Sequence, residues 1–227
     1  MPVDPLDNPV WSALSGPQAR LSVSSGRFAR YRDDVGVFVA VANPADGFDG
    51  LAGALPANAL VGIVTAETVE VPPGFDVVEV STVPQMVASD FQRVPIDRRV
   101  TELGDANVPA MLELTALTRP GPFLSRTIEM GRYVGVFDGT RLVAMAGERM
   151  RPAGFTEISA VCTHPDFQGR GHAKALMTLV ADGIVARGET PFLHVRAANA
   201  IAIGAYRSLG FVVRREMVFT VLRKSSP

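Results

Sequence analysis

Two stretches in the second half of the sequence carry residues whose types and spacing suit ligand chemistry. The first is QGRGHA (168–173), in which two glycines one residue apart separate an apolar run from a long amphipathic one. A turn from a strand into a helix leaves several backbone N–H groups unpaired at the positive end of the helix dipole. Such a turn suits a phosphate or pyrophosphate, although a glycine pair alone is equally typical of a tight connecting turn.

Two familiar phosphate-binding motifs do not fit this glycine pair. A Walker loop requires the pattern G-x-x-x-x-G-K-[ST], which the sequence lacks. A dinucleotide fingerprint requires G-x-G-x-x-G, and here Lys174 takes the place of the last glycine. The next predicted strand also ends in FLHVR, without the acidic residue that binds a ribose. A dinucleotide-binding domain is therefore disfavoured.

The second stretch is NAIAIGAYRSLGF (199–211). Asn199, Ala202 and Tyr206 follow one another at spacings of three and four, so they share one face of a helix over about 10 Å. An amide, a small side chain and a phenol in a line suit an extended ligand that carries amides of its own. Taken singly, Asn199 has the ordinary interpretation of a helix N-cap and Tyr206 that of a core aromatic residue with a wet tip. The joint pattern favours a ligand site.

Together the two stretches resemble the GNAT superfamily of N-acetyltransferases. Its pyrophosphate loop has the form [QR]-x-x-G-x-[GA], matched by Gln168, Gly171 and Ala173. Its later segment has the form N-x-x-A-x-x-x-Y-x-x-x-G-F, which residues 199–211 match in full. The resemblance covers residues 100–224 and implies acetyl-CoA, or another acyl-CoA, as the donor. The acceptor would be an amine of a small molecule or a peptide.

The resemblance also implies which residues hold the donor. The loop amides from Gly169 to Lys174 would bind the pyrophosphate. The strand segment Val161–Thr163 would pair with the pantetheine in a splayed gap between two strands. The predicted donor-binding residues are Val161, Cys162, Thr163, Gln168, Gly169, Arg170, Gly171, His172, Ala173, Lys174, Asn199, Ala202 and Tyr206.

Acyl transfer to an amine needs a neutral nucleophile, a polarised thioester carbonyl and a proton for the leaving thiolate. The resemblance makes Tyr206 the acid, and the backbone N–H of Val161, on a bulged strand, the group that polarises the carbonyl. Glu157 is the predicted base, because it stands eleven residues before Gln168, where histone-acetylating members carry their catalytic glutamate. A solvent-facing strand glutamate is the other interpretation of Glu157. Glu148, His194 and water chains are the alternative bases.

The elements that must position these residues follow from the periodicity and turn signals after about residue 100, which predict the order β-α-β-β-β-α-β-α-β. The expected ranges are a strand near Val100, a helix from Asp105 ended by Pro120-Gly121-Pro122, a hairpin over Arg132–Met150 turning at Asp138-Gly139, a strand over Phe155–Thr163, a helix after the glycine loop, a strand over Pro191–Val195, a helix over Asn199–Leu209, and one or two strands over Phe211–Lys224. With the resemblance, the fold class is α/β (α+β), a GNAT acyl-CoA N-acyltransferase fold with a mixed, mostly antiparallel sheet flanked by helices.

The region before residue 99 carries no catalytic motif and is predicted to be an α/β lobe. Its expected strands are 36–42, 59–65 and a pair within 69–80 around a Pro-Pro-Gly turn, with at most one short helix in the loop 43–58. The predicted division is therefore 1–98 and 99–227. By analogy with two-lobed GNAT members, including relatives of glycine N-acyltransferase, the first part would be a degenerate GNAT-like half that helps to wall the acceptor pocket.

Composition limits the partners. The chain of 227 residues has a net charge of −1 and no dense run of Lys and Arg, so we expect no nucleic-acid partner. No apolar run reaches the length of a membrane span, and the first residues lack the pattern of a signal peptide. Cys162, the single cysteine, fits a reducing cytoplasm and is expected to be a core residue rather than an acyl carrier. His164, His172 and His194 show no metal-ligand spacing with Cys162, so no metal is expected.

The predicted function is an acyl-CoA-dependent N-acyltransferase, in its simplest form an N-acetyltransferase, with a homodimer compatible with the sequence. The alternative is an acyl-CoA-binding sensor or interaction module without turnover. The presence of Tyr206 favours the enzyme.

Overall fold

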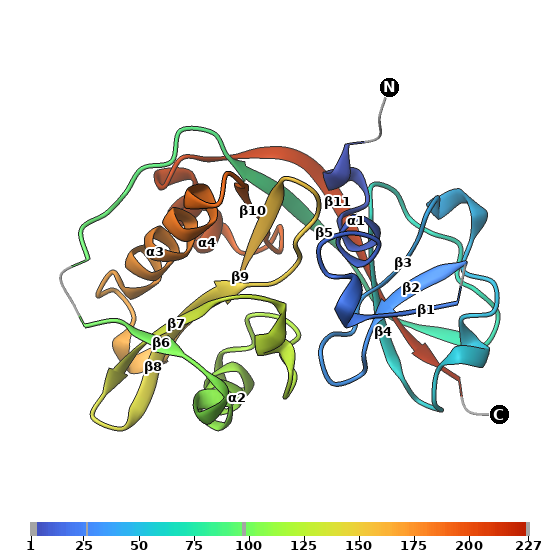
Figure 1. The fold of residues 1–227 in the computed structure, drawn as a ribbon, viewed down its shortest axis with the longest axis horizontal. Coiled ribbons are helices and arrows are strands. Elements are labelled where there is room, and N and C mark those ends of the chain that lie inside the picture. Colours follow the sequence, from blue (N-terminus) through green and yellow to red (C-terminus); the bar gives the residue numbers. More distant parts are fainter. Residues whose placement is uncertain (1–3, 26, 97–98, 226–227) are drawn as a thin grey trace.

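Two long strands join the two lobes of the molecule (Figure 1). The computed structural model describes residues 4–25, 27–96 and 99–225. In it, β5 (Phe75–Ala88) and β11 (Phe211–Lys224) pair antiparallel over their whole length and run from one lobe into the other. An eight-stranded sheet therefore extends through both lobes, in the order β4-β11-β5-β10-β9-β8-β7-β6.

The lobe that holds the two motifs has the predicted order of elements. They are β6 (Thr101–Leu103), α2 (Val108–Thr118), β7 (Tyr133–Asp138), β8 (Arg141–Glu148), β9 (Phe155–Thr163), α3 (His172–Ala186), β10 (Thr190–His194), α4 (Ala200–Ser208) and β11, with short 3-10 helices at Asp105–Asn107, Thr127–Met130 and Pro165–Phe167. The mixed sheet is mostly antiparallel, and within it β9 and β10 run parallel. The predicted fold class is confirmed.

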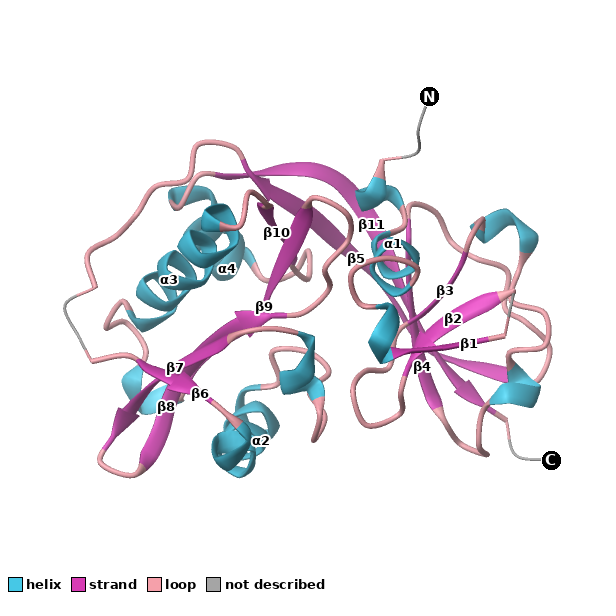
Figure 2. Cartoon of the chain, in the orientation of Figure 1, coloured by secondary structure: helices cyan, strands magenta, loops and turns pink. Residues whose placement is uncertain are grey.

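Helices cover both faces of this part of the sheet. Figure 2 shows α3 and α4 on one side of the strands and α2 on the other. One side of α3 carries an apolar stripe, which packs into the core through Leu176, Val180 and Ile184, against residues of β7 and β8 such as Val134 and Ala146. The stripe therefore fixes the start of α3, and with it the glycine loop, to the sheet.

The N-terminal lobe contributes to two sheets. Its elements are α1 (Pro9–Leu14), β1 (Ser22–Ser24), β2 (Phe28–Tyr31), β3 (Val39–Val41), β4 (Leu60–Thr65) and 3-10 helices at Pro5–Asp7, Ala19–Leu21, Pro44–Asp46 and Ala52–Ala54. Strands β1, β2 and β3 form a separate antiparallel sheet. A bridge between Phe38 and Gly62 connects this small sheet to β4.

Three details of the N-terminal prediction are wrong. The segment 69–80 holds one strand rather than two, because β5 starts only at Phe75, after Gly74. Pro72 and Pro73 have no backbone N–H to donate, so the chain before Gly74 joins no ladder. The expected strand 36–42 is reduced to Val39–Val41, and the loop 43–58 holds two short 3-10 helices instead of one helix.

The division into 1–98 and 99–227 stays a prediction, and its boundary falls at residues 97–98, outside the described residues. The pairing of strands crosses it. β5 lies between β10 and β11, so a strand from before the boundary completes the sheet of the part after it. The N-terminal lobe and the lobe with the motifs therefore share backbone hydrogen bonds.

Candidate active site

A cavity of about 830 Å³ lies against the glycine loop, α4 and the N-terminal lobe. The predicted donor-binding residues that line it are Val161, Cys162, Thr163, Gln168, Gly169, Gly171, His172, Ala173, Lys174, Asn199, Ala202 and Tyr206. Arg170 does not line it, because its guanidinium lies 4.6 Å from the centre of the Phe167 ring and donates to the Asp166 carbonyl at 3.0 Å. The two sequence motifs therefore meet at one cavity.

The cavity opens where β9 and β10 separate. The two strands pair only from Thr190 opposite Phe155 to Phe192 opposite Glu157. Further along β9, Ala160 has a φ of +52°, and the register with β8 shifts between Met145 and Gly147. This bulge comes directly before Val161. The expected splayed gap and bulged strand are both confirmed.

The glycine loop has the backbone that an anion site requires. Gly169 and Gly171 have φ values of +74° and +76°, a conformation that other residues adopt only with strain. The first hydrogen bond of α3 runs from the Ala175 N–H to the Gly171 carbonyl at 3.2 Å. Ala173 and Lys174 come before that bond, in the first turn of α3, where backbone amides have no acceptor within the helix. The loop therefore fits a pyrophosphate.

Helix α4 presents its predicted face to the cavity. Asn199 is the N-cap, and its Oδ1 accepts from the Ala202 N–H at 3.1 Å. Asn199 therefore acts as an ordinary helix cap through its oxygen, and its amide nitrogen Nδ2 takes no part in this capping bond. Ala202 and Tyr206 follow on the same face and line the cavity.

Tyr206 and Cys162 share an environment that opposes charge. Burial raises the pKa of Tyr206 to about 12, and the nearby Cys162 thiol adds to the increase. Burial likewise raises the pKa of Cys162 to about 11. Both groups are therefore protonated at neutral pH. The thiol is a poor nucleophile in this state, whereas the phenol can donate a proton.

Glu157 lies in the sheet behind the cavity wall and is fully buried. Both of its oxygens bind Arg149, Oε1 to Nη2 at 2.7 Å and Oε2 to Nε at 2.8 Å, and Oε1 also accepts from His194 Nδ1 at 2.7 Å. Burial alone would raise the pKa of Glu157, but the charge and hydrogen bonds of Arg149, together with His194, hold it well below its usual range. The solvent-facing interpretation is wrong. The role of base stays a prediction, since Arg149 and His194, rather than Glu157, line the cavity.

The neighbouring residues hold the ring of His194 from two sides. Gln85, from β5, contacts the Leu6 carbonyl and His194 Nε2 through its amide nitrogen, at 2.9 and 3.1 Å. Its amide oxygen accepts from Arg214 at 2.9 Å. If the oxygen and nitrogen of the amide changed places, the oxygen would face the Leu6 carbonyl and the nitrogen would face the Arg214 guanidinium, so both hydrogen bonds would be lost. His194 therefore bridges Gln85, through Nε2, and Glu157, through Nδ1. Through Gln85 the N-terminal lobe holds the ring of His194 in place.

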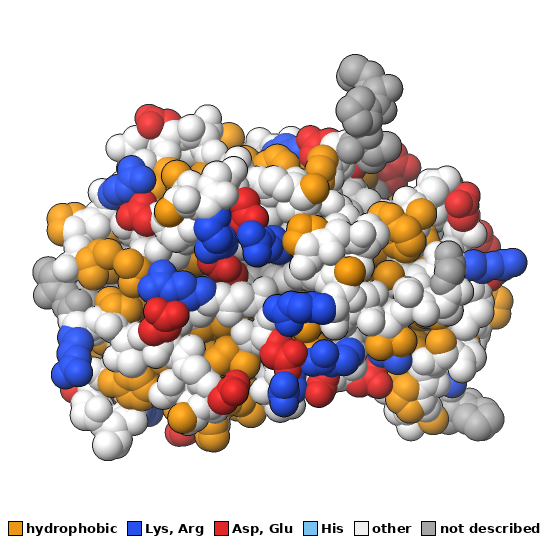
Figure 3. Space-filling model, in the orientation of Figure 1, with side chains coloured by type: hydrophobic (Ala, Val, Ile, Leu, Met, Phe, Trp, Pro, Cys, Tyr) orange, Lys and Arg blue, Asp and Glu red, His pale blue; other side chains and the backbone are white. Residues whose placement is uncertain are grey.

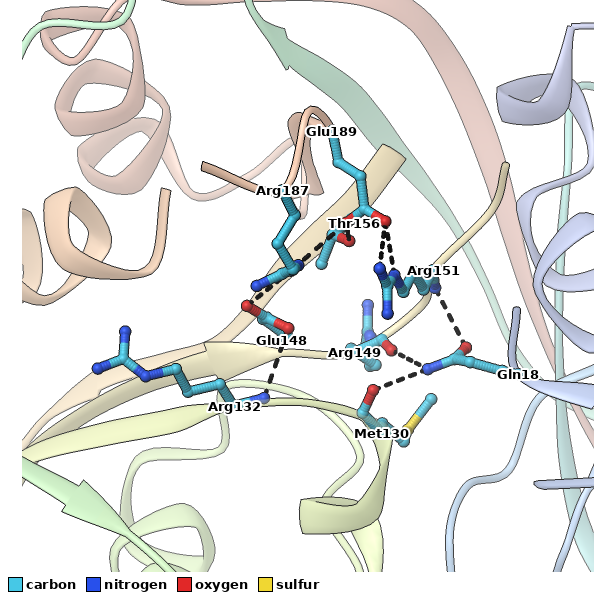
Figure 4. Close-up of polar contacts among 9 residues, drawn as sticks. All are labelled: Gln18, Met130, Arg132, Glu148, Arg149, Arg151, Thr156, Arg187 and Glu189. Atoms are coloured by element: carbon cyan, nitrogen blue, oxygen red, sulfur yellow. Dashed lines mark hydrogen bonds and ion pairs between the residues drawn. The ribbon is translucent and has the colours of Figure 1, made fainter. Parts of the chain in front are cut away.

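Glu148, another alternative base, takes part in an ion pair with Arg187 near the junction of the lobes (Figure 4). Its Oε1 accepts from Arg187 at 3.0 Å and its Oε2 from the Arg132 N–H at 3.4 Å. In the same view, Gln18 of the N-terminal lobe donates to the carbonyls of Met130 and Arg149, at 2.9 and 2.7 Å. Glu148 does not line the cavity. Arg149 does line the cavity, and Gln18 holds its backbone carbonyl.

Sequence patterns did not point to several residues of the cavity wall. Arg149 follows directly after the buried strand β8. A buried arginine needs an acidic partner, and on that ground the sequence could have suggested its pairing with Glu157. Phe38 and Phe219 belong to apolar stretches with no pattern that separates cavity residues from core residues. Four neighbouring strands supply the contacting residues: β9 holds Glu157, β8 ends just before Arg149, β10 holds His194 and β5 holds Gln85. Only the order of strands in the sheet brings these residues together.

The structure gives two further limits. Among the described residues, no three His, Cys, Asp or Glu side chains are grouped so that they could hold a metal ion. Over the same part of the chain, no helix has the length and apolar character to cross a membrane. On the face of the molecule in Figure 3, Lys and Arg side chains are interspersed with Asp and Glu across the junction of the lobes.

Comparison with known proteins agrees with this geometry. The model of the "FR47-like protein" family matches residues 133–220. The [ribosomal protein bS18]-alanine N-acetyltransferase of Escherichia coli K12 is 44% identical over 118 residues, which are 49% of this chain and 79% of that enzyme. The N-alpha-acetyltransferase RimI of Mycobacterium tuberculosis is 37% identical over 83 residues, and there the match spans 35% of this chain and only 51% of the relative.

Solved structures cover the N-terminal lobe as well. A crystal structure of a GNAT-family protein from Novosphingobium aromaticivorans is 44% identical, with a TM-score of 0.91 over 98% of this chain and 100% of that one. A GCN5-related N-acetyltransferase from Kribbella flavida, 16% identical, shares the fold with a TM-score of 0.61 over 95% of this chain and 94% of that one. From this identity and coverage, joined to the motifs and the splayed sheet, the chain belongs to the GNAT superfamily of N-acetyltransferases.

Proposed function

We propose that the protein transfers an acetyl group from acetyl-CoA to the primary amine of a small molecule or peptide. The observation that carries this proposal is the single cavity that joins the glycine loop, the gap between β9 and β10, and Tyr206 to residues of the N-terminal lobe. In this proposal the donor binds on one side of Tyr206, the acid, and the acceptor binds on the other. A cytoplasmic location fits a chain with one cysteine.

The residues around the cavity fit acetyl-CoA, which would supply the activated acetyl group and leave as a thiolate. The amides of the glycine loop, at the positive end of α3, would bind the pyrophosphate. The edge of β9 beyond Phe155–Glu157 and the Asn199 amide would hold the pantetheine. The Val161 N–H, directly after the bulge, would donate to the thioester oxygen.

Tyr206 is proposed to protonate the sulfur of the leaving group. A thiol in this environment is a weak acid, as the pKa of about 11 for Cys162 illustrates. A thiolate formed beside it would be correspondingly basic. With a pKa of about 12, Tyr206 is a close match for that thiolate and stays protonated until it is needed.

Release of free thiol tests the proposal. The protein would be incubated with acetyl-CoA and a panel of amines, and thiol release and the mass of each amine would be followed. We expect thiol release that depends on an amine and yields its acetylated product. If coenzyme A binds in a calorimetric titration but no amine raises thiol release, the alternative of a non-catalytic acyl-CoA-binding module would replace the enzyme.

A further inference from the structure

The wall that the N-terminal lobe gives to the cavity is apolar and buried. Phe38, Val64 and Val83 line it with exposed fractions of 3%, 5% and 6%, whereas Ile201, beside the donor motif, is 89% exposed. Phe219 of β11 completes this wall, and its ring lies 6.0 Å from that of Phe38. These four residues, Phe38, Val64, Val83 and Phe219, are called the apolar wall below.

The polar groups beside the apolar wall are already neutralised. Arg149 lies with its guanidinium 4.8 Å from the centre of the Phe38 ring, and Glu157 binds it through two hydrogen bonds from behind. His194 lies between Glu157 and Gln85 and contacts both. The wall therefore offers no net negative charge to a ligand.

The charges on the cavity surface have one sign. Among the described residues that line the cavity none is Asp or Glu, and the permanently charged ones are Arg119, Arg149, Lys174 and Arg196. An ammonium group that enters would lose water and meet no carboxylate, so its charged form is penalised and its pKa falls. A second cationic group on the same acceptor would meet the same penalty.

From this wall, and on the basis of the proposed function, we propose that the acceptor is a small primary monoamine with an apolar body, bound as the neutral amine. Its body packs against the apolar wall, and its nitrogen faces the thioester between Tyr206 and Val161. A polypeptide terminus fits less well, because its backbone N–H and C=O groups would be buried against the apolar wall, whose four side chains offer them no partner.

The chemistry balances without a dedicated base. The amine nitrogen forms a bond to the acetyl carbon, and the bond from that carbon to sulfur breaks. Tyr206 gives its proton to the sulfur, and the proton that the amine loses restores the phenol. Because the amine enters neutral, Glu157 and His194 need not take up a proton.

Competition among amines tests the inference on the unaltered protein. We would measure kcat/KM for 2-phenylethylamine, 1,4-diaminobutane and a tripeptide with an N-terminal alanine. The monoamine should be preferred, and its kcat/KM should rise about tenfold per pH unit below the pKa of the free amine, as the neutral fraction does. Preference for the diamine or the tripeptide would overturn the inference and leave the acetyltransferase proposal intact.

A substitution in the apolar wall then locates the acceptor. Val64→Phe should lower kcat/KM for 2-phenylethylamine by roughly 10–100-fold, since the ring fills the space of the acceptor body, while ethylamine and the affinity for coenzyme A change little. Val77→Phe is the matched control, because Val77 is in the same lobe, half exposed and outside the cavity. Equal loss for both amines, or loss in the control as well, would overturn the assignment. If Val64→Phe does not fold, the comparison of kcat/KM among the three amines on the unaltered protein still tests the inference.

Discussion

At the scale of single residues, the properties of the cavity follow from how strongly it opposes charge. The same burial raises the pKa of the Tyr206 phenol and of the Cys162 thiol. Behind the cavity wall, the buried charges of Arg149 and Glu157 balance each other. An acyl transfer in which all reactants enter neutral suits such a site.

Tyr206→Phe keeps the ring and removes the proton. Coenzyme A affinity, measured by calorimetry, should be unchanged, while kcat falls by something like 100-fold. Ile201→Ala is a control on the same helix that keeps the phenol. Full activity of Tyr206→Phe would mean that another donor serves the thiolate.

Glu157→Gln separates a base from a residue that positions others. The geometry favours positioning, because Glu157 contacts Arg149 and His194 and not the cavity. We therefore expect kcat/KM to fall by a similar factor at every pH from 6.5 to 9. A deficit that shrinks as the pH rises, where more amine is already neutral, would instead make Glu157 the base.

The same substitution should also change stability with pH. The folded pKa of Glu157 is lowered, so its carboxylate stabilises the fold fully above its unfolded pKa, and this contribution is lost as the pH falls through the folded value. Glu157→Gln leaves Arg149 buried without its counter-charge and should cost about 3 kcal/mol at pH 7. Denaturant melts should show this difference constant above pH 5 and smaller as the pH drops below 4.5, the ordinary value for Glu. A difference that grows on acidification would contradict it.

The sequence was enough to predict the side chains expected to bind the acyl donor, but not the surroundings of Glu157 and His194. Two short sequence motifs contain Tyr206, Asn199 and the loop glycines. Residues so close in sequence keep their spacing on one helix or loop when the chain folds. The burial of Glu157 could not be foreseen, because alternation in β9 does not show that both faces of this strand are covered. The contact of His194 with Gln85 could not be foreseen either, because the two residues are 109 positions apart and no spacing rule connects them.

At the scale of elements, the turn into α3 is the most exacting piece of backbone near the donor. Gly171→Glu should place a side chain and a negative charge against the phosphates and weaken coenzyme A binding at least roughly tenfold. Gly171→Ala is the matched control, since it shares the backbone strain at a φ of +76° and lacks the charge. Unchanged affinity in the glutamate variant, measured by calorimetry, would remove the pyrophosphate from this loop.

The helices of the motif-bearing lobe were predictable because each has its own apolar period and end signals. Helix α4 runs over Ala200–Ser208, with Asn199 as its cap, close to the predicted range. β5 was not predictable, since its length and partner depend on β11, whose residues lie more than 120 positions later. Its start was misread because a Pro-Pro-Gly turn usually joins two strands, and here it only precedes one.

At the scale of the whole molecule, the N-terminal lobe should be indispensable. A chain that starts at Val94 would lack β5, so β10 and β11 would each lose the strand between them. We expect this shortened chain to be insoluble or to lack the circular dichroism of the full sheet, and we expect a separate chain of residues 1–93, produced together with it, to restore solubility. A soluble, fully active shortened chain would show that β10 and β11 do not need β5.

The position of β5 also sets a delay during synthesis. β5 ends at Ala88, and its first partner begins at Thr190, so at about 5–20 residues per second the strand waits roughly 5–20 s before it can pair. During that time its valines, Val77 and Val78 among them, are open to other chains. Asp76, Glu79 and Pro84 interrupt the apolar run of β5 and should limit such contacts until the sheet closes.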